Sequence, residues 1–328
     1  MDWQPSAKLE TLRKRAAILS TIRRFFTTRK VLEVETPALS AGTVTDVHLE
    51  ALQTQHPSNG HFDAMALYLQ TSPEYAMKRM LAAGYPDIFQ ICKCFREDEV
   101  GTLHNPEFTM LEWYRRDFAM QNLIDEVGEL LIEVLGVKTI EQCSYQKVFV
   151  DHLQLDPFAT SIDELLAISA QKGLSDYAEQ LVKQGYRDTV LFDALLQVLF
   201  SQEIEPRIGQ YVPVCISHFP HSQAALAKLE PESNTALRFE FYYKGVELAN
   251  GFEELSDPNI QAVRFEQDNE QRSKLGKPAK PIDFRFMNAL RAGLPNCSGV
   301  AMGIDRLIML ALDCESISEV ISFDIQRA

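Results

Sequence analysis

Two strand-like stretches, residues 88–96 and 108–114, follow one another with only a short loop between them. In the second stretch Phe108, Met110, Glu112 and Tyr114 occupy alternate positions, so a strand would carry all four side chains on one face. Strands joined by a short loop run antiparallel, and the pair therefore predicts a hairpin. With Arg96 ending the first strand, one pocket would receive a cation, an aromatic ring, a carboxylate and a phenol, a set suited to a nucleotide and an amino-bearing substrate.

Antiparallel pairing is also expected for further strand patterns at 212–217 and 238–243. A strand with several glycines at 299–306 leads into an apolar helix. No glycine-rich phosphate loop of either nucleotide-binding type is present, so a Rossmann fold has no support in the sequence. The prediction is an α+β fold, an antiparallel sheet flanked by helices. Helical patterns fall at residues 8–30, 123–134, 155–205 and 261–276.

The overall charge argues against general nucleic-acid binding. The net charge is -14 over 328 residues, so the surface as a whole repels phosphate backbones. Residues 1–30 are the exception, with eight lysines and arginines against Asp2 and Glu10. This basic segment is either a solvated helix face or a docking surface for an acidic partner.

The cysteines and apolar runs indicate a reduced, cytoplasmic protein. The six cysteines are scattered, without the spacing of a zinc site or a disulfide framework. The N-terminus lacks a signal-peptide core. The longest apolar run, residues 307–312, is too short to span a membrane.

Glutamates after residue 239 suggest a metal site. Glu240 and Glu247 flank a plausible turn at Lys244-Gly245 and can meet on one face of a hairpin. A carboxylate pair in that position suits Mg²⁺. The alternative is that both are surface glutamates. Asn250 and Glu254 share strand parity with each other but not with Glu247. If all three serve one pocket, the strand must bend or bulge, and Gly251 is the expected place.

Three glutamates far apart in the sequence predict an acidic pocket. Glu74 follows Ser72 and Pro73, which can cap and start a helix. Together with Glu112 and Glu254, it would select an ammonium or a diamine, because buried carboxylates need paired positive charge.

Two arginines complement these carboxylates. Arg96 and Arg306, if they reach a common point, can hold a triphosphate through charged hydrogen bonds. His104 can reach a terminal phosphate or be an ordinary loop histidine.

These residues make the family recognisable. Over about residues 12–326 the chain resembles class II aminoacyl-tRNA synthetases, and among them the catalytic domain of lysyl-tRNA synthetase. The first class II motif corresponds to residues 23–37, the second to 95–114 and the third to 303–306. Within the second, residues 104–112 (HNPEFTMLE) match the lysyl enzyme nearly letter for letter.

The resemblance implies roles for individual residues. It implies an ATP site formed by Arg96, Glu97, Asp98, His104, Asn105, Phe108, Glu247, Leu248, Gly303 and Arg306. It implies a substrate site formed by Ser72, Pro73, Glu74, Glu112, Tyr114, Asn250, Glu254 and Ala301. Arg96 and Arg306 would be the catalytic residues, and Glu240 and Glu247 would bind Mg²⁺.

The chain also departs from lysyl-tRNA synthetases. Asp98 replaces the usual glutamate, Leu103 a basic residue and Ala301 a glycine of the amino-acid pocket. The first motif begins near residue 23, so we expect no large anticodon-binding domain ahead of it. We therefore expect residues 1–328 to form one catalytic domain with a helical insertion near 155–205.

This combination is similar to the stand-alone bacterial paralogues of lysyl-tRNA synthetase. That resemblance implies ATP-dependent activation of (R)-β-lysine and its transfer to a lysine of elongation factor P, by a homodimer that does not use tRNA. Three alternatives stay open: a minimal enzyme that charges tRNA, a non-catalytic regulatory paralogue, and an amide-forming synthetase of the asparagine synthetase type.

Overall fold

An eight-stranded sheet forms the centre of the computed structural model, which describes residues 3–58, 65–97, 100–233 and 235–328. In spatial order its strands are β1 (Leu32–Glu33), β5 (Ile88–Phe95), β6 (Glu107–Arg116), β11 (Cys297–Gly303), β10 (Val246–Glu253), β9 (Thr235–Tyr243), β8 (Val214–Pro220) and β7 (Glu141–Ser144). Only the two outermost pairs, β1–β5 and β7–β8, run parallel. The predicted antiparallel α+β fold is thus confirmed, as is the hairpin of β5 and β6.

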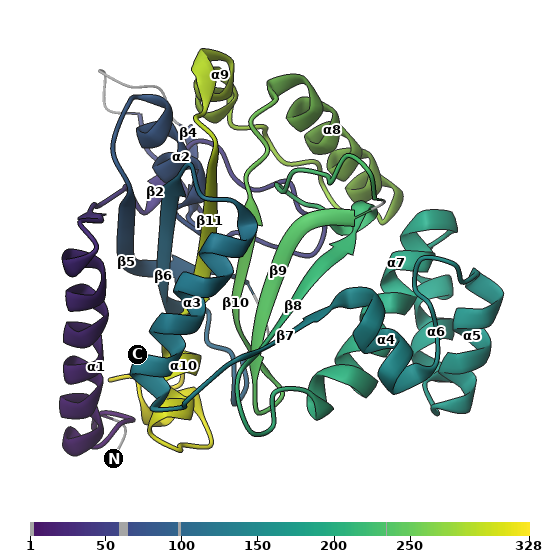
Figure 1. The fold of residues 1–328 in the computed structure, drawn as a ribbon. Coiled ribbons are helices and arrows are strands. Elements are labelled where there is room, and N and C mark those ends of the chain that lie inside the picture. Colours follow the sequence, from purple (N-terminus) through teal and green to yellow (C-terminus); the bar gives the residue numbers. More distant parts are fainter. Residues whose placement is uncertain (1–2, 59–64, 98–99, 234) are drawn as a thin grey trace.

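Helices cover the sheet on several sides. They are α1 (Leu9–Thr28), α2 (Glu74–Ala82), α3 (Met120–Leu135), α4 (Tyr145–Leu153), α5 (Ile162–Gln171), α6 (Ser175–Lys183), α7 (Asp188–Leu199), α8 (Pro258–Lys274), α9 (Phe284–Gly293) and α10 (Ile304–Ala311). Figure 1 shows α1 along one side of the molecule and α4 to α7 at the opposite side. None of the helices within the described ranges has the length and apolar character needed to cross a membrane.

The main hydrophobic core lies between the sheet and α1, α3 and α10. Phe26 of α1 stacks on Phe89 of β5, with ring centroids 4.5 Å apart, and meets Trp113 of β6 edge-on. Leu111 and Trp113 are fully buried in this core. Because side chains alternate along a strand, the even-numbered residues of β6 face the other side of the sheet.

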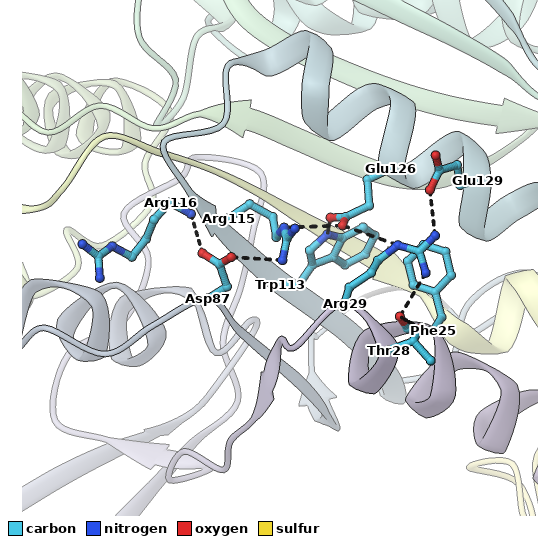
Figure 2. A network of polar contacts seen from close by, with 9 residues as sticks. All are labelled: Phe25, Thr28, Arg29, Asp87, Trp113, Arg115, Arg116, Glu126 and Glu129. Carbon is cyan, nitrogen blue, oxygen red and sulfur yellow. Dashed lines mark hydrogen bonds and ion pairs between the residues drawn. The ribbon is translucent and has the colours of Figure 1, made fainter.

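A network of charged groups fixes α1 and α3 to the back of β6 (Figure 2). Glu126 of α3 is buried and accepts a hydrogen bond from the Trp113 indole at 3.1 Å. One of its oxygens lies 3.4 Å from Arg115 and 3.9 Å from Arg29, and Arg29 also pairs with Glu129 at 2.7 Å. Burial raises the pKa of Glu126 although the Arg115 charge opposes the shift.

The helices between β7 and β8 have a core of their own. Tyr145, Phe149 and Phe200 pack there against Ile216 and Tyr242 of the sheet. The helical stretch that we expected at 155–205 contains α5, α6 and α7, then a π-helical turn, Phe200–Ile204, and a 3₁₀ turn, Glu205–Arg207.

A smaller sheet lies beside the hairpin, made of β2 (Leu39–Ser40), β4 (Met65–Leu69) and β3 (Gln53–His56). The chain passes directly from β4 through Ser72 into α2, so this sheet positions the start of that helix.

Candidate active site

The floor of the site is one row of residues across four strands. Glu112 of β6 pairs with Ala301 of β11, Ala301 with Asn250 of β10, and Asn250 with Glu240 of β9. Side chains of directly paired residues project from the same face of a sheet. Residues from four separate sequence segments therefore line one surface, as the predicted site requires.

A bulge in β10 brings Glu247 onto this surface. The register shifts between Glu247, which pairs with Tyr242, and Ala249, so that Leu248 is the extra residue. The bulge that we expected at Gly251 was therefore placed wrongly. Gly251 pairs regularly with Phe239, and a Cβ atom there would lie 2.3 Å from the Phe239 ring. Gly251 serves close packing, and the bend lies three residues earlier.

Glu112 is held by two hydroxyl groups at one end of the pocket. Ser72 donates to one of its oxygens at 2.6 Å and Tyr114 donates to the other at 2.7 Å. Ser72 also accepts from the Glu74 backbone N–H at 3.0 Å, which ties the start of α2 to the same site. Burial, with the Glu74 charge, raises the pKa of Glu112 to about 8.

Lys78 is a pocket residue that the sequence did not suggest. Its ammonium lies 2.6 Å from Glu74 and 2.5 Å from Glu254, and its side chain is 1% exposed. Burial alone lowers the pKa of Lys78, but the charges of Glu254 and Glu74 outweigh that effect and raise it. Burial raises the pKa of Glu254 to about 8 even against the Lys78 charge. The sequence feature that could have indicated Lys78 is its i, i+4 spacing from Glu74. That spacing is common on exposed helix surfaces, so it does not single out a pocket residue.

Three residues come together at the opposite end of the site. Arg306, in the first turn of α10, donates to His104 at 2.7 Å and to the backbone oxygen of Glu247 at 3.1 Å. The Glu247 carboxylate lies 3.8 Å from the same guanidinium. The second and third motifs thus meet here, as the resemblance implied.

Arg96 lies at the edge of the hairpin beside Phe108. Its guanidinium carbon is 5.2 Å from the centre of the Phe108 ring, and its buried Nε has no hydrogen-bond partner. An unsatisfied buried donor is costly, and an anionic ligand would remove that cost.

Glu240 is more constrained than we expected. It is buried and accepts hydrogen bonds from Arg238, from Tyr242 and, at 3.1 Å, from Asn250. Burial raises the pKa of Glu240, with the Arg238 charge opposing. Arg238 and Tyr242 were missed because their role depends on a buried carboxylate that only the fold reveals.

The Glu240–Glu247 pair fits Mg²⁺ in donor type. The two carboxylates face the same side of the hairpin, and Glu247 is 40% exposed. Among the described residues, no group of three His, Cys, Asp or Glu side chains is arranged to hold a metal ion. A site of one or two carboxylates that takes its other oxygens from phosphates and water is the usual one for Mg²⁺.

Several predicted ATP-site residues have their side chains engaged elsewhere. Leu248 is buried in the main core. The Asn105 amide donates to the Glu107 backbone at 2.6 Å and accepts from Ile325 N–H at 3.0 Å. Glu97 is exposed, and its backbone N–H donates to Glu50 at 2.9 Å. Contacts from Leu248 or Asn105 to a nucleotide would therefore come mainly from the backbone.

The remaining predicted residues lie at strand and helix ends. Gly303 ends β11 and is the N-cap residue of α10, and Pro73 is the N-cap residue of α2. Asp98 lies outside the described residues.

A family model for class II tRNA synthetases (D, K and N) matches residues 1–327. The chain belongs to this family. Membership explains why the hairpin of β5 and β6, the β9–β10 hairpin and the β11–α10 junction converge on one site in this class II tRNA synthetase fold.

Two relatives with names match this chain over almost its whole length. An elongation factor P–(R)-β-lysine ligase of Klebsiella pneumoniae subsp. pneumoniae is 52% identical over 327 residues, which cover 99% of this chain and 98% of the relative. The protein of that name from Salmonella paratyphi B is also 52% identical, with the same coverage.

Proposed function

We propose that this class II synthetase is an ATP-dependent ligase that activates (R)-β-lysine as an adenylate and transfers it to the ε-amino group of a lysine on elongation factor P. The observation that carries the proposal is the cluster of buried Glu112 and Glu254 with half-buried Glu74, beside Tyr114, in a chain 52% identical to ligases of that name. A buried acidic cluster selects a substrate with more than one ammonium group, because only matched positive charge offsets its desolvation.

The substrate would lie along the row of paired residues. Its amino groups would bind the oxygens of Glu74, Glu112 and Glu254, with Ser72, Pro73 and Tyr114 fixing the pocket wall. Asn250 and Arg96 would hold the carboxylate near the nucleotide. Ala301, between Glu112 and Asn250 in the row, limits the space beside the substrate backbone.

ATP would occupy the other end of the site. The Phe108 ring would stack on adenine, and Arg306 with His104 would contact the terminal phosphates. Glu97, Asp98, Asn105, Leu248 and Gly303 complete the proposed nucleotide site. Mg²⁺, held by Glu240 and Glu247, supplies charge neutralisation of the phosphate oxygens when it is bound.

In the first step, the substrate carboxylate oxygen attacks the α-phosphorus, and the bond to the bridging oxygen breaks, which releases pyrophosphate. Negative charge grows on phosphate oxygens, and Arg96 and Arg306 stabilise it. Arg306 is held before the reaction by hydrogen bonds to Leu103, Glu247 and His104, so positioning supplies part of the rate gain, up to about 7–11 kcal/mol in favourable systems.

In the second step, the neutral ε-amine of the acceptor lysine attacks the adenylate carbonyl. An amide forms, AMP leaves, and the amine loses a proton. The net charge of -14 supports a protein acceptor over tRNA, since a strongly acidic surface repels RNA.

We also propose that residues 1–328 act as one catalytic domain, that α4 to α7 are an insertion in it, and that the protein is a cytoplasmic homodimer. The dimer would form through residues 23–37, whose short strand β1 lies at the edge of the large sheet. Leu32 of this strand is 45% exposed, and Leu39, two residues beyond the segment, is 44% exposed. Exposed leucines favour a surface that a second subunit covers.

The test is an acceptor assay. The purified protein is incubated with ATP, Mg²⁺ and (R)-β-lysine, and with either elongation factor P or total tRNA, and both acceptors are weighed by intact mass spectrometry. The proposal predicts one β-lysyl group on the protein and none on tRNA.

A further inference from the structure

We propose that Lys78 is a positioning residue of the substrate pocket, whose ammonium binds one oxygen each of Glu74 and Glu254 and leaves their remaining oxygens for the amino groups of the substrate. The inference rests on the proposed function and extends it to a residue outside the substrate set that the resemblance implied.

The geometry gives Lys78 one oxygen of each carboxylate. Its Nζ atom lies 2.6 Å from Oε1 of Glu74 and 2.5 Å from Oε2 of Glu254. Oε1 of Glu254 faces β11 instead, because a Cβ atom on Gly299 would come within 2.5 Å of it and within 2.3 Å of the Tyr114 ring. Lys78 therefore contacts Oε2 of Glu254, and Oε1 lies beside Gly299 on the face of β11 that also carries Ala301.

The ammonium is sealed from solvent. The Lys78 side chain is 1% exposed, and the Phe286 ring of α9 lies 5.9 Å from Nζ. A buried lysine stays charged only when carboxylates compensate it. The three groups therefore stabilise one another, and removing the lysine would leave the buried Glu254 carboxylate close to the half-buried Glu74 carboxylate.

Charge counting links Lys78 to substrate choice. Glu74, Glu112 and Glu254 supply three negative charges when ionised, and Lys78 supplies one positive charge. The remaining two match the two ammonium groups of a 3,6-diaminohexanoate. Without Lys78, Glu254 would hold its proton more tightly and release it less readily to a bound diamine, because Glu74 and Glu112 already disfavour its charged form. A neutral acid binds an ammonium more weakly than a carboxylate does.

The test compares Lys78→Met with Arg79→Met. Both changes remove one positive charge from α2, but Arg79 is exposed. We expect Lys78→Met to weaken (R)-β-lysine binding at least about tenfold by isothermal titration calorimetry, with unchanged ATP affinity. Arg79→Met should bind both ligands like the unmodified protein. In pyrophosphate exchange, the KM for (R)-β-lysine should rise about as much while kcat changes little.

Two results would overturn the inference. One is that Lys78→Met binds (R)-β-lysine as tightly as the unmodified protein does. The other is that the variant loses affinity for ATP and for (R)-β-lysine equally, since equal loss would reveal a merely structural lysine. If the unmodified protein itself does not bind (R)-β-lysine, the proposed function fails first, so the two failures are distinguishable.

A measurement on the unmodified protein guards against a variant that does not fold. In ¹⁵N NMR of the lysine side chains, one solvent-protected ammonium signal should shift when (R)-β-lysine is added and should not shift with 6-aminohexanoate, which lacks the second amine. A protected signal that ignores (R)-β-lysine would contradict the inference.

Discussion

Ala301 of β11 is the direct cross-strand partner of both Glu112 on β6 and Asn250 on β10. Its methyl group thus lies between a residue proposed to bind a substrate amine and one proposed to bind the substrate carboxylate. The lysyl-tRNA synthetases that the chain resembles have glycine at this position. We therefore expect the size of this one side chain to control the space between the two ends of the substrate.

The first prediction concerns this methyl group. Ala301→Gly should raise the use of α-lysine relative to (R)-β-lysine by about tenfold, because one methyl group in a pocket is worth roughly 1–3 kcal/mol. The measurement is kcat/KM for both amino acids in pyrophosphate exchange. An unchanged ratio would remove Ala301 from the specificity argument.

Gly299, two residues earlier on β11, provides the matched control. A Cβ atom at Gly299 would lie 2.3 Å from Tyr114 and 2.5 Å from Glu254. Gly299→Ala should therefore reduce the use of both amino acids together, without a change in preference.

The second prediction concerns the metal site. Glu240→Gln and Glu247→Gln should each lower pyrophosphate exchange by about tenfold or more. They should also raise the Mg²⁺ concentration needed for half-maximal exchange, since amides are poorer ligands for this ion than carboxylates. Glu232→Gln, at an exposed loop residue, is the control for loss of one negative charge. Exchange equal to that of the control would exclude both glutamates from the site.

The third prediction concerns pH. The pKa values of Glu112 and Glu254 are raised to about 8 in the empty pocket, so these carboxyls hold protons that a bound diamine must displace. Affinity for (R)-β-lysine should rise from pH 6 to pH 8, by up to about tenfold per pH unit for each proton released. Calorimetry in buffers of different ionisation enthalpy measures that release directly, and a flat profile would contradict it.

The same shifts have the opposite effect on the empty protein. Between the ordinary glutamate value of 4.5 and the folded value of about 8, the folded state binds more protons than the unfolded chain. The contribution of these two groups to stability therefore decreases as pH rises through that window.

The fourth prediction concerns the network of Figure 2. Glu126→Ala should lower the free energy of unfolding by about 3 kcal/mol, because it leaves the buried Trp113 indole without a partner and leaves Arg115 with Asp87 alone. Glu129→Ala, on the same helix, should cost less than about 1 kcal/mol, because Glu129 forms an exposed pair with Arg29. Denaturant unfolding of both variants measures the difference, and equal costs would refute a special role for Glu126.

The sequence predicted those parts of the site that depend on local alternation. Glu112 and Tyr114 share a face because strand periodicity is strict, and the Lys244-Gly245 turn follows from the hairpin around it. The bulge was misplaced because Gly251 satisfies a packing requirement from Phe239, on a neighbouring strand. Long-range packing of this kind has no signature in a single strand.

Lys78 illustrates the same limit for charge. On the sequence it is one lysine among several on helices, and its partner Glu254 lies on a distant segment. Only the packing of α2 against the end of β10 turns this lysine into a buried counter-charge.

The proposed function requires that the activated amino acid is transferred to protein. The most direct measurement is intact mass spectrometry of elongation factor P and of total tRNA after incubation with the purified protein, ATP, Mg²⁺ and (R)-β-lysine. We predict that elongation factor P gains the mass of one β-lysyl group and that tRNA stays uncharged. Charged tRNA with unmodified elongation factor P would contradict the proposed function.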